Sequence, residues 1–180
     1  MSIEQTAVLR VEDLTIAIDH DDGLRYAVQS LALTVKRGET FALVGESGSG
    51  KSMTAMALLR LLPDALEVVD GKIFLEGVDV NALPESAMQR IRGGRAAMIF
   101  QEPGTSLNPV MRVGDQLLEA IRAHTSLRGK PARDKAIEWL KRVGIPEPEV
   151  RIDDFSFQFS GGQKQRIMIA MALAAEPDLL

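Results

Sequence analysis

A short segment rich in glycine, residues 45–52, contains the residue types that bind the phosphate groups of a nucleotide. Its sequence, Gly-Glu-Ser-Gly-Ser-Gly-Lys-Ser, fits a loop in which backbone N–H groups converge on an anion. The apolar run at 40–44 predicts a buried strand before the loop, and residues 51–62 predict a helix after it. This strand–loop–helix order predicts nucleotide binding. A glycine-rich turn that only caps a helix is the alternative interpretation.

Each residue type in this loop suits one part of a bound nucleotide. Gly45, Gly48 and Gly50 permit left-handed φ angles and close approach of the backbone to a β-phosphate. Lys51 can place a positive charge between the β- and γ-phosphates, and the hydroxyl of Ser52 can ligate Mg²⁺. The helix that follows adds the partial positive charge of its N-terminus. The predicted nucleotide-binding residues are Gly45, Glu46, Ser47, Gly48, Ser49, Gly50, Lys51, Ser52 and Met53.

Two further segments carry residues suited to the same chemistry. Residues 95–100 are apolar enough to predict another short strand, which leads to Gln101, whose side-chain amide can reach a metal ion and its water. Downstream, Ser160 precedes two glycines where a helix is predicted to begin, so it can act as the N-cap while the glycines leave backbone N–H groups uncovered. We predict a second anion-binding helix start there, formed by Ser160, Gly161, Gly162 and Gln163.

Together the three motifs resemble those of the ATPase subunits of ABC transporters. Residues 45–52 match the Walker A motif, Gln101 matches the Q-loop and residues 160–163 match the signature, in the same order and spacing. The resemblance covers essentially all 180 residues. The Gln-Glu-Pro of the Q-loop, followed by Thr-Ser-Leu-Asn-Pro at 105–109 and Val-Gly at 113–114, is similar to the importers of oligopeptides, dipeptides, glutathione and nickel.

The resemblance implies an ATP-binding, energy-coupling subunit of an importer for peptides or similar small solutes. In this family two ATPase domains, identical or different, close head to tail around two ATP molecules and Mg²⁺. Lys51 and Ser52 would hold the phosphates and the metal, and Gln101 would contact Mg²⁺ and sense the γ-phosphate and its water. Ser160, Gly161 and the adjoining signature residues would cover the ATP of the opposite domain.

The same resemblance implies where the subunit acts and what it contacts. Closure of the dimer would move a helical subdomain against transmembrane permease subunits, which receive solute from an extracytoplasmic binding protein. The subunit would therefore lie peripherally on the cytoplasmic face of the membrane. Because the permease and the binding protein choose the solute, peptide, glutathione and nickel all stay open.

The remaining sequence predicts an α/β fold around these motifs. Alternating apolar residues predict strands at 8–18 and 31–35, and Asp70-Gly71 predicts a turn before a strand at 72–75, which indicates an antiparallel β-subdomain. Residues 113–143 have helical periodicity instead. We expect a single ABC ATPase domain, incomplete at its C-terminus, with the β-subdomain and P-loop NTPase core at 1–100, the α-helical subdomain at 101–159 and the signature helix at 160–180.

The composition excludes several other classes of protein. The 21 basic and 25 acidic residues give a formal charge of −4, and the positive residues are scattered among acids, which argues against nucleic-acid binding. With no cysteine, the chain can form no disulfide and no cysteine-ligated zinc site. The apolar run at 167–175 is far shorter than the roughly 20 residues of a membrane helix. It predicts a buried helix, and any spanning of the membrane is left to other chains.

The sequence departs from the family pattern at two places. Ile18 stands where relatives place an aromatic residue that stacks on adenine, and Tyr26 is the nearest aromatic alternative. Phe-Ser-Phe at 155–157 replaces a Tyr-Pro-His shortly before the signature. The two histidines, His20 and His124, lie near no motif, so we predict surface positions for both.

The sequence ends at Leu180, before the strand that in this family carries the Walker B aspartate and the catalytic glutamate, and before the later switch histidine. We therefore expect an open sheet edge and poor solubility of this segment in isolation. Asp70 and Glu76 follow apolar residues, but their place in the β-subdomain does not fit a substitute ligand. A non-hydrolysing nucleotide-binding fragment stays open as an alternative. A soluble ABC ATPase of repair or translation is disfavoured by the stretch at 106–109 and the lack of a basic face.

Overall fold

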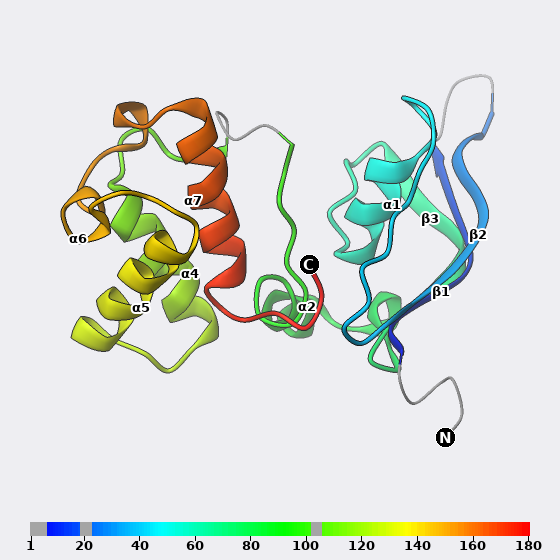
Figure 1. The fold of residues 1–180 in the computed structure, drawn as a ribbon. Helices are drawn as coiled ribbons and strands as arrows, with labels where there is room; N and C mark the ends of the chain where they lie inside the picture. Colours follow the sequence, from blue (N-terminus) through cyan, green and yellow to red (C-terminus); the bar gives the residue numbers. More distant parts are fainter. Residues whose placement is uncertain (1–6, 19–22, 102–105) are drawn as a thin grey trace. The chain divides into compact units, whose positions relative to one another are not determined.

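The computed structural model describes residues 7–18, 23–101 and 106–180. It divides into two compact units, Met1–Gln89 and Arg90–Leu180 (Figure 1). The first unit contains the sheet and the predicted phosphate-binding loop, and the second contains Gln101 and the signature helix.

The first unit is built on a four-stranded antiparallel sheet with the strand order β2-β1-β3-β4. The strands are β1 (Ala7–Ile18), β2 (Arg25–Lys36), β3 (Leu66–Leu75) and β4 (Val78–Asp79). Their inward-facing apolar side chains form the core of this unit, as the alternating sequence pattern predicts. Fully buried side chains of the sheet include Val11, Leu14, Ile16 and Ile73. The predicted antiparallel sheet is therefore confirmed.

The predicted turn at Asp70-Gly71 is wrong, because both residues lie inside β3. Gly71 has a left-handed φ of +91°, and a Cβ atom there would lie 2.5 Å from the carbonyl oxygen of Glu12 on β1. The pairing of β1 with β3 shifts register between Glu12 and Thr15. The glycine therefore accommodates an irregularity of the ladder instead of ending a strand.

The strand predicted at 40–44 is also absent. These residues form no strand in the described structure, and the side chain of Val44 is 89% exposed. A strand is defined by hydrogen bonds to a neighbour, so an apolar run without a pairing partner does not become one. The segment leads as irregular chain into the glycine-rich loop.

The strand predicted at 95–100 is only partly formed. Ala96 makes isolated parallel bridges to Arg92 and to Leu179. The N–H of Ala97 donates to the carbonyl oxygen of Leu179 at 2.9 Å, and the N–H of Asp178 donates to that of Arg95 at 2.8 Å. The prediction is wrong for residues 98–100, which form no strand in the described structure. Like the run at 40–44, they have no pairing partner among the described residues.

The helix after the glycine-rich loop, α1 (Lys51–Leu58), lies along one face of the sheet in Figure 1 and is shorter than predicted. It buries Thr54 and Ala57. It ends because Arg60 adopts a left-handed φ of +52°. A 3₁₀ turn, η2 (Val80–Ala82), and α2 (Glu85–Ile91) follow the sheet.

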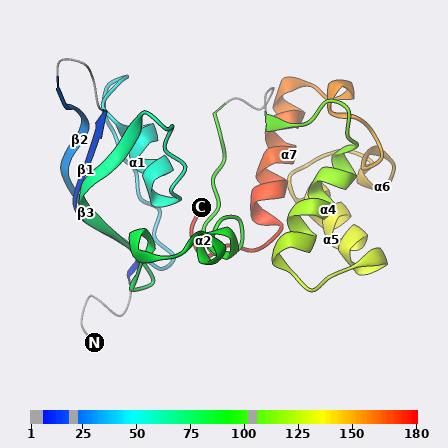
Figure 2. The ribbon, with the colours of Figure 1, turned by 180° about the vertical axis from the view of Figure 1, so that it is seen from behind.

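The second unit is helical. It contains α4 (Val113–His124), α5 (Gly129–Arg142), α6 (Pro148–Arg151), a 3₁₀ turn η3 (Ser156–Gln158) and α7 (Gly161–Leu173), and Figure 2 shows α4, α5 and α7 packed together. The apolar face predicted for α4 is buried, and Ile167, Met168 and Ala170 of the apolar run in α7 are buried too. The shared core includes Val113, Leu117, Leu118, Ile121, Leu140, Ile152, Phe159, Ile167 and Ala174.

Of the two histidines predicted at the surface, His124 is partly exposed, and His20 lies outside the described residues. His124 is half-buried at the end of α4, where its ring packs against the backbone of Gly93 and Gly94. A Cβ atom on Gly93 would lie 2.6 Å from Nε2 of the ring. Among helices in the described part of the chain, none combines the length and the apolar character that crossing a bilayer requires.

Candidate nucleotide-binding site

The glycine-rich loop presents the N-terminus of α1 at the surface. Gly50 is the N-cap of the helix, in the left-handed conformation and without a capping side chain. The helical hydrogen bonds begin with the N–H of Thr54, which donates to the carbonyl oxygen of Gly50 at 2.8 Å. The amides before Thr54 precede this ladder, and the first turn contains no acidic residue. The helix start therefore offers N–H donors and positive potential to an anion.

The side chain of Lys51 folds back over the loop. Its Nζ donates to the carbonyl oxygens of Gly45 at 2.8 Å and Glu46 at 2.6 Å, and to the Oγ of Ser49 at 3.1 Å. These contacts hold the ammonium group over the loop that precedes the helix start. The donors gathered here are backbone amides, an ammonium and hydroxyl groups, so the chemistry of the set fits a phosphate chain.

The glycines of the loop are required for two different reasons. Gly48 and Gly50 both have a φ of +84°, which confirms the predicted left-handed conformation. The prediction is wrong for Gly45, whose φ is not in that region. Gly45 is needed for space instead, because a Cβ atom there would lie 2.6 Å from the Oγ of Ser49. Gly50 meets both requirements, since its Cβ would lie 2.5 Å from the carbonyl oxygen of Ala27.

The structure places Gln101 at an exposed bend, at the end of a described segment. The stretch that follows in the predicted motif, residues 102–105, lies outside the described residues. Ser52 belongs to the first unit and Gln101 to the second, so their joint binding of Mg²⁺ stays a prediction. Within the described ranges, no group of three or more acidic or histidine side chains could hold a metal.

Gln116 anchors the segment after the Q-loop, and sequence reasoning missed it. Its side chain is 5% exposed on α4, where its Oε1 accepts the N–H of Asn108 at 2.9 Å. Its Nε2 donates to the carbonyl oxygens of Asn108 at 3.0 Å and Met111 at 3.2 Å. The available signal was a single amide on the otherwise apolar face between Val113 and Leu117. A buried amide at such a place indicates a fixed polar partner.

The signature residues begin α7 with a reciprocal cap. The Oγ of Ser160 accepts the N–H of Gln163 at 3.3 Å, and the Oε1 of Gln163 accepts the N–H of Ser160 at 3.0 Å. This confirms the predicted N-cap. A Cβ atom on Gly161 or Gly162 would meet no atom within 4 Å, so both glycines lie open on this helix start.

The aromatic residues before the signature lie against each other. The rings of Phe155 and Phe157 are stacked, with centroids 5.6 Å apart, and Phe157 is 67% exposed. Between them the hydroxyl-bearing Ser156 is buried. The Phe-Ser-Phe stretch therefore forms a defined turn, η3, rather than an extended approach to Ser160.

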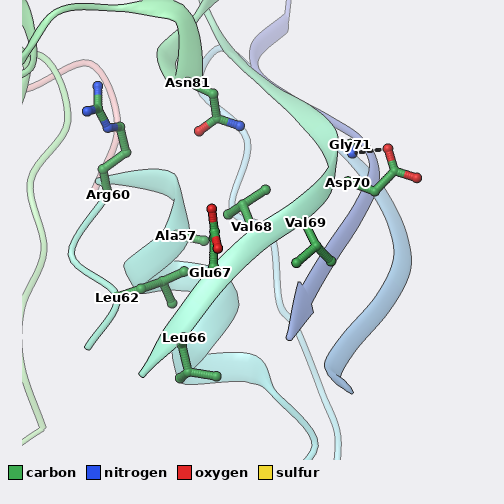
Figure 3. A pocket seen from close by; sticks show the side chains of 10 residues that line it. All are labelled: Ala57, Arg60, Leu62, Leu66, Glu67, Val68, Val69, Asp70, Gly71 and Asn81. Atoms are coloured by element: carbon green, nitrogen blue, oxygen red, sulfur yellow. Dashed lines mark hydrogen bonds between the residues drawn. The ribbon is translucent and has the colours of Figure 1, made fainter. Parts of the chain in front are cut away.

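A cavity of about 580 Å³ lies between α1 and β3, away from the phosphate-binding loop (Figure 3). None of its lining residues belongs to 45–52. Ala57, Leu62 and Leu66 give it an apolar wall, and Arg60 reaches from its edge to the carbonyl oxygen of Leu83 at 2.6 Å. At the far end of the lining, the carboxylate of Asp70 accepts the N–H of Gly71 at 2.8 Å. The cavity therefore contributes nothing to the predicted phosphate contacts.

Comparison with known proteins decides the family. The model of the ABC transporter family matches residues 28–180, a range that includes the loop, Gln101 and residues 160–163. The chain belongs to the ABC transporter family. The family that the sequence predicted for this ABC cassette is thereby confirmed.

Relatives of this ABC cassette include peptide-transport proteins. It is 45% identical over 179 residues to the oligopeptide transport ATP-binding protein OppD of Bacillus subtilis, covering 99% of this chain and 50% of that protein. It is also 45% identical to the dipeptide transport ATP-binding protein DppD of the same organism, covering 96% of this chain and 52% of that protein. The predicted resemblance to the peptide branch is confirmed. The chain spans about half the length of these curated relatives.

Solved structures similar to this ABC cassette have the same fold. The dimeric bacterial ABC transporter cassette MJ0796 matches with a TM-score of 0.81 and 26% identity, covering 94% of this chain and 70% of the other. A second structure of MJ0796 is a dimeric post-hydrolysis state bound to ADP and phosphate, with a TM-score of 0.82. The α/β fold class that the sequence predicted is confirmed by these neighbours.

Proposed function

We propose that this chain is the nucleotide-binding part of an energy-coupling subunit, in which ATP binding and hydrolysis drive a peptide-type importer. The observation that carries the proposal is the loop at 45–52, where Lys51 and the first amides of α1 converge on an exposed helix start. Membership of the ABC transporter family and the peptide-transport relatives support the same function.

The loop residues would divide the ATP contacts among them. Lys51 exchanges its loop carbonyl partners for the β- and γ-phosphates, and the amides that precede the Thr54 hydrogen bond donate to the β-phosphate oxygens. Ser52 supplies a hydroxyl ligand to Mg²⁺, and Gln101 contacts the same ion and the attacking water. Charge-assisted hydrogen bonds contribute about 1.5–3 kcal/mol each, so losing one such contact is expected to weaken ATP binding by about tenfold to a hundredfold.

The signature helix would act on a second ATPase domain. Ser160 and the open amides of Gly161 and Gly162 would cover the ATP bound by the opposite subunit. The dimeric state of the cassette MJ0796, in one case with ADP and phosphate, supports a dimer for this chain too, and the arrangement that we propose for it is head to tail.

Permease subunits are the partners through which closure of this dimer would act. The related cassette cbiO1 of Clostridium perfringens is part of the ABC transporter complex cbiONQ, which supports such an assembly. The chain would then lie at the cytoplasmic face of the membrane, with an extracytoplasmic binding protein as an indirect partner. Peptides are the proposed class of solute because the relatives are oligopeptide and dipeptide transporters.

Titration with a fluorescent ATP analogue in the presence of Mg²⁺ tests the nucleotide site. Lys51→Ala is expected to weaken affinity by about tenfold to a hundredfold, because it removes a charge-assisted contact. Lys72→Ala, which removes an exposed charge on β3, is the matched control and is expected to bind like wild type. Equal affinity of the two variants would contradict the site. Phosphate release by the native protein, absent in Lys51→Ala, separates hydrolysis from binding without turnover.

A further inference from the structure

The residue that organises the approach to the signature is Arg151, at the end of α6. Its Nη2 donates to the carbonyl oxygen of Gln158 at 3.1 Å, and its guanidinium carbon lies 4.1 Å from the ring centroid of Phe159. Its Nε donates to the carboxylate of Asp154 at 3.2 Å. One guanidinium therefore contacts the two residues that immediately precede Ser160.

The contacts of Arg151 lie in a largely buried environment and not on the open surface. The side chain of Arg151 is 20% exposed and Phe159 is 5% exposed in the core of the helical unit. Phe159 therefore packs against the core of the helical unit and is also covered by the guanidinium of Arg151. Ser160, the next residue, has its own hydroxyl and N–H engaged in the cap of α7. The direction in which Ser160 enters the helix is set by these two groups of contacts.

We propose that Arg151 is a positioning residue for Ser160, holding the signature helix start in the orientation that covers the ATP of the opposite subunit. The inference rests on the proposed function and adds a residue that none of the three motifs contains. It also explains how a chain with Phe-Ser-Phe at 155–157 fixes its signature, because the contacts of Arg151 fall on Gln158 and Phe159, which follow that stretch.

The chemistry of the contact requires a guanidinium. A planar group can stack on Phe159 while its edge donates to a carbonyl and a carboxylate at once. A lysine ammonium keeps the charge but has no planar face, so Arg151→Lys is expected to keep only part of the effect. Arg151→Met keeps an unbranched apolar stem and loses both hydrogen bonds and the cation–π contact.

Arg142 offers a matched control in the same unit. Its guanidinium carbon lies 4.8 Å from the ring centroid of Trp139, and its Nη2 donates to Glu138 at 2.5 Å. Like Arg151, it combines a carboxylate with an aromatic ring, but its side chain is 56% exposed, and these contacts lie on α5 and include no residue next to the signature. Arg142→Met and Arg142→Lys therefore report the cost of losing such a pair without moving Ser160.

The experiment measures ATP binding, ATP turnover and hydrogen exchange on the native protein purified with the chains that accompany it. Arg151→Met is expected to bind ATP with Mg²⁺ within about twofold of wild type, because the loop at 45–52 is unchanged, while kcat falls by about tenfold to a hundredfold from misplacement of Ser160. Arg151→Lys should give an intermediate kcat. Amide exchange should accelerate in peptides spanning 158–163 and stay unchanged in those spanning 164–173.

The outcomes separate this inference from the function on which it rests. If Ser160→Ala leaves turnover unchanged, the proposed role of the signature itself is wrong. If Ser160→Ala lowers kcat but Arg151→Met and Arg142→Met have equal turnover, only the positioning role is overturned. A fall in ATP affinity in Arg151→Met as large as its fall in kcat would also overturn it, because a positioning residue for the opposite subunit's ATP does not act on its own loop. Should Arg151→Met fail to fold, the kcat of Arg151→Lys against Arg142→Lys decides the question.

Discussion

Gly50 and Ala27 lie so close that a Cβ atom on Gly50 would be 2.5 Å from the carbonyl oxygen of Ala27. Strand β2 is therefore in direct contact with the last glycine of the phosphate-binding loop. The sheet thus helps to fix the position at which α1 begins.

Gly50→Ala combines this clash with a left-handed φ of +84°. We expect it to lower the free energy of unfolding by about 2–4 kcal/mol and to weaken ATP binding, because the loop must move. Gly48→Ala has the same φ but meets no atom within 4 Å, so it should cost only about 1–2 kcal/mol. Urea denaturation followed by circular dichroism measures both, and equal losses would show that the contact with Ala27 is unimportant.

The cap of α7 should be cooperative. Ser160→Ala and Gln163→Ala each remove one of two reciprocal hydrogen bonds, and each is expected to cost about 1 kcal/mol. The double variant should lose about 0.5 kcal/mol less than the sum, because either bond helps to orient the other. Thermal denaturation of all three, with Gln165→Ala as an exposed control, checks this. Strict additivity would mean that the two bonds act independently.

The buried amide of Gln116 predicts an unusual pH dependence in a variant. Gln116→Leu should destabilise the protein by about 1–3 kcal/mol, because the hydrogen bonds to Asn108 and Met111 are lost. In Gln116→Glu a carboxylate would face two carbonyl oxygens, so we expect a larger loss at pH 7. Protonation restores one donor, so stability relative to wild type should recover as the pH falls.

Stability of the Gln116 variants is measured by urea denaturation between pH 5 and pH 8, a range that brackets a raised carboxyl pKa. Glu119→Gln changes an exposed residue of the same helix and should show no such recovery. A Gln116→Glu variant with a pH-independent deficit would contradict the assigned hydrogen bonds.

The ion pair of Arg133 and Asp153 should stabilise the helical unit only above acidic pH. Hydrogen bonds from Arg133 hold the pKa of Asp153 below its ordinary value of 3.8. Because the folded pKa is lower than the unfolded one, the contribution is complete above the ordinary value and is lost as the pH falls through the folded pKa. Arg133→Met should therefore have a lower Tm than wild type at pH 7.

That difference in Tm should shrink towards zero as the pH is lowered below 3.8. The corresponding difference in the free energy of unfolding should be small throughout, below about 1 kcal/mol, because both side chains are exposed to solvent. Differential scanning calorimetry across this pH range measures it, with Arg122→Met on α4 as the control. A difference that is the same at every pH would mean that packing of the arginine stem, and not the charge pair, is responsible.

Local sequence patterns predicted the elements whose structure depends on near neighbours in the chain. The apolar face of α4, the alternation along β1 and the cap at Ser160 all follow from spacings of two to four residues. The glycines at 48 and 50 were predictable because their backbone conformation is a property of the loop itself.

Features that depend on distant pairing could not be read from the sequence. The apolar run at 40–44 has the composition of a strand, but whether it becomes one is decided by a neighbour elsewhere in the chain. The irregularity at Gly71 depends in the same way on residues 12–13 of β1. Arg151 and Gln116 were missed because their partners are a ring and backbone groups, which carry no sequence signal of their own.

The pairing of residues 95–97 with 178–179 joins the two ends of the helical unit. Arg95 and Asp178, which form an ion pair there, are separated by 83 positions in the chain. The entropy cost of closing so long a loop is repaid only when its ends meet, so this contact of high sequence separation is expected to form after the local helical contacts. During folding, the helices between these ends should therefore assemble first, and the bonds that join residues 95–97 to residues 178–179 should form last.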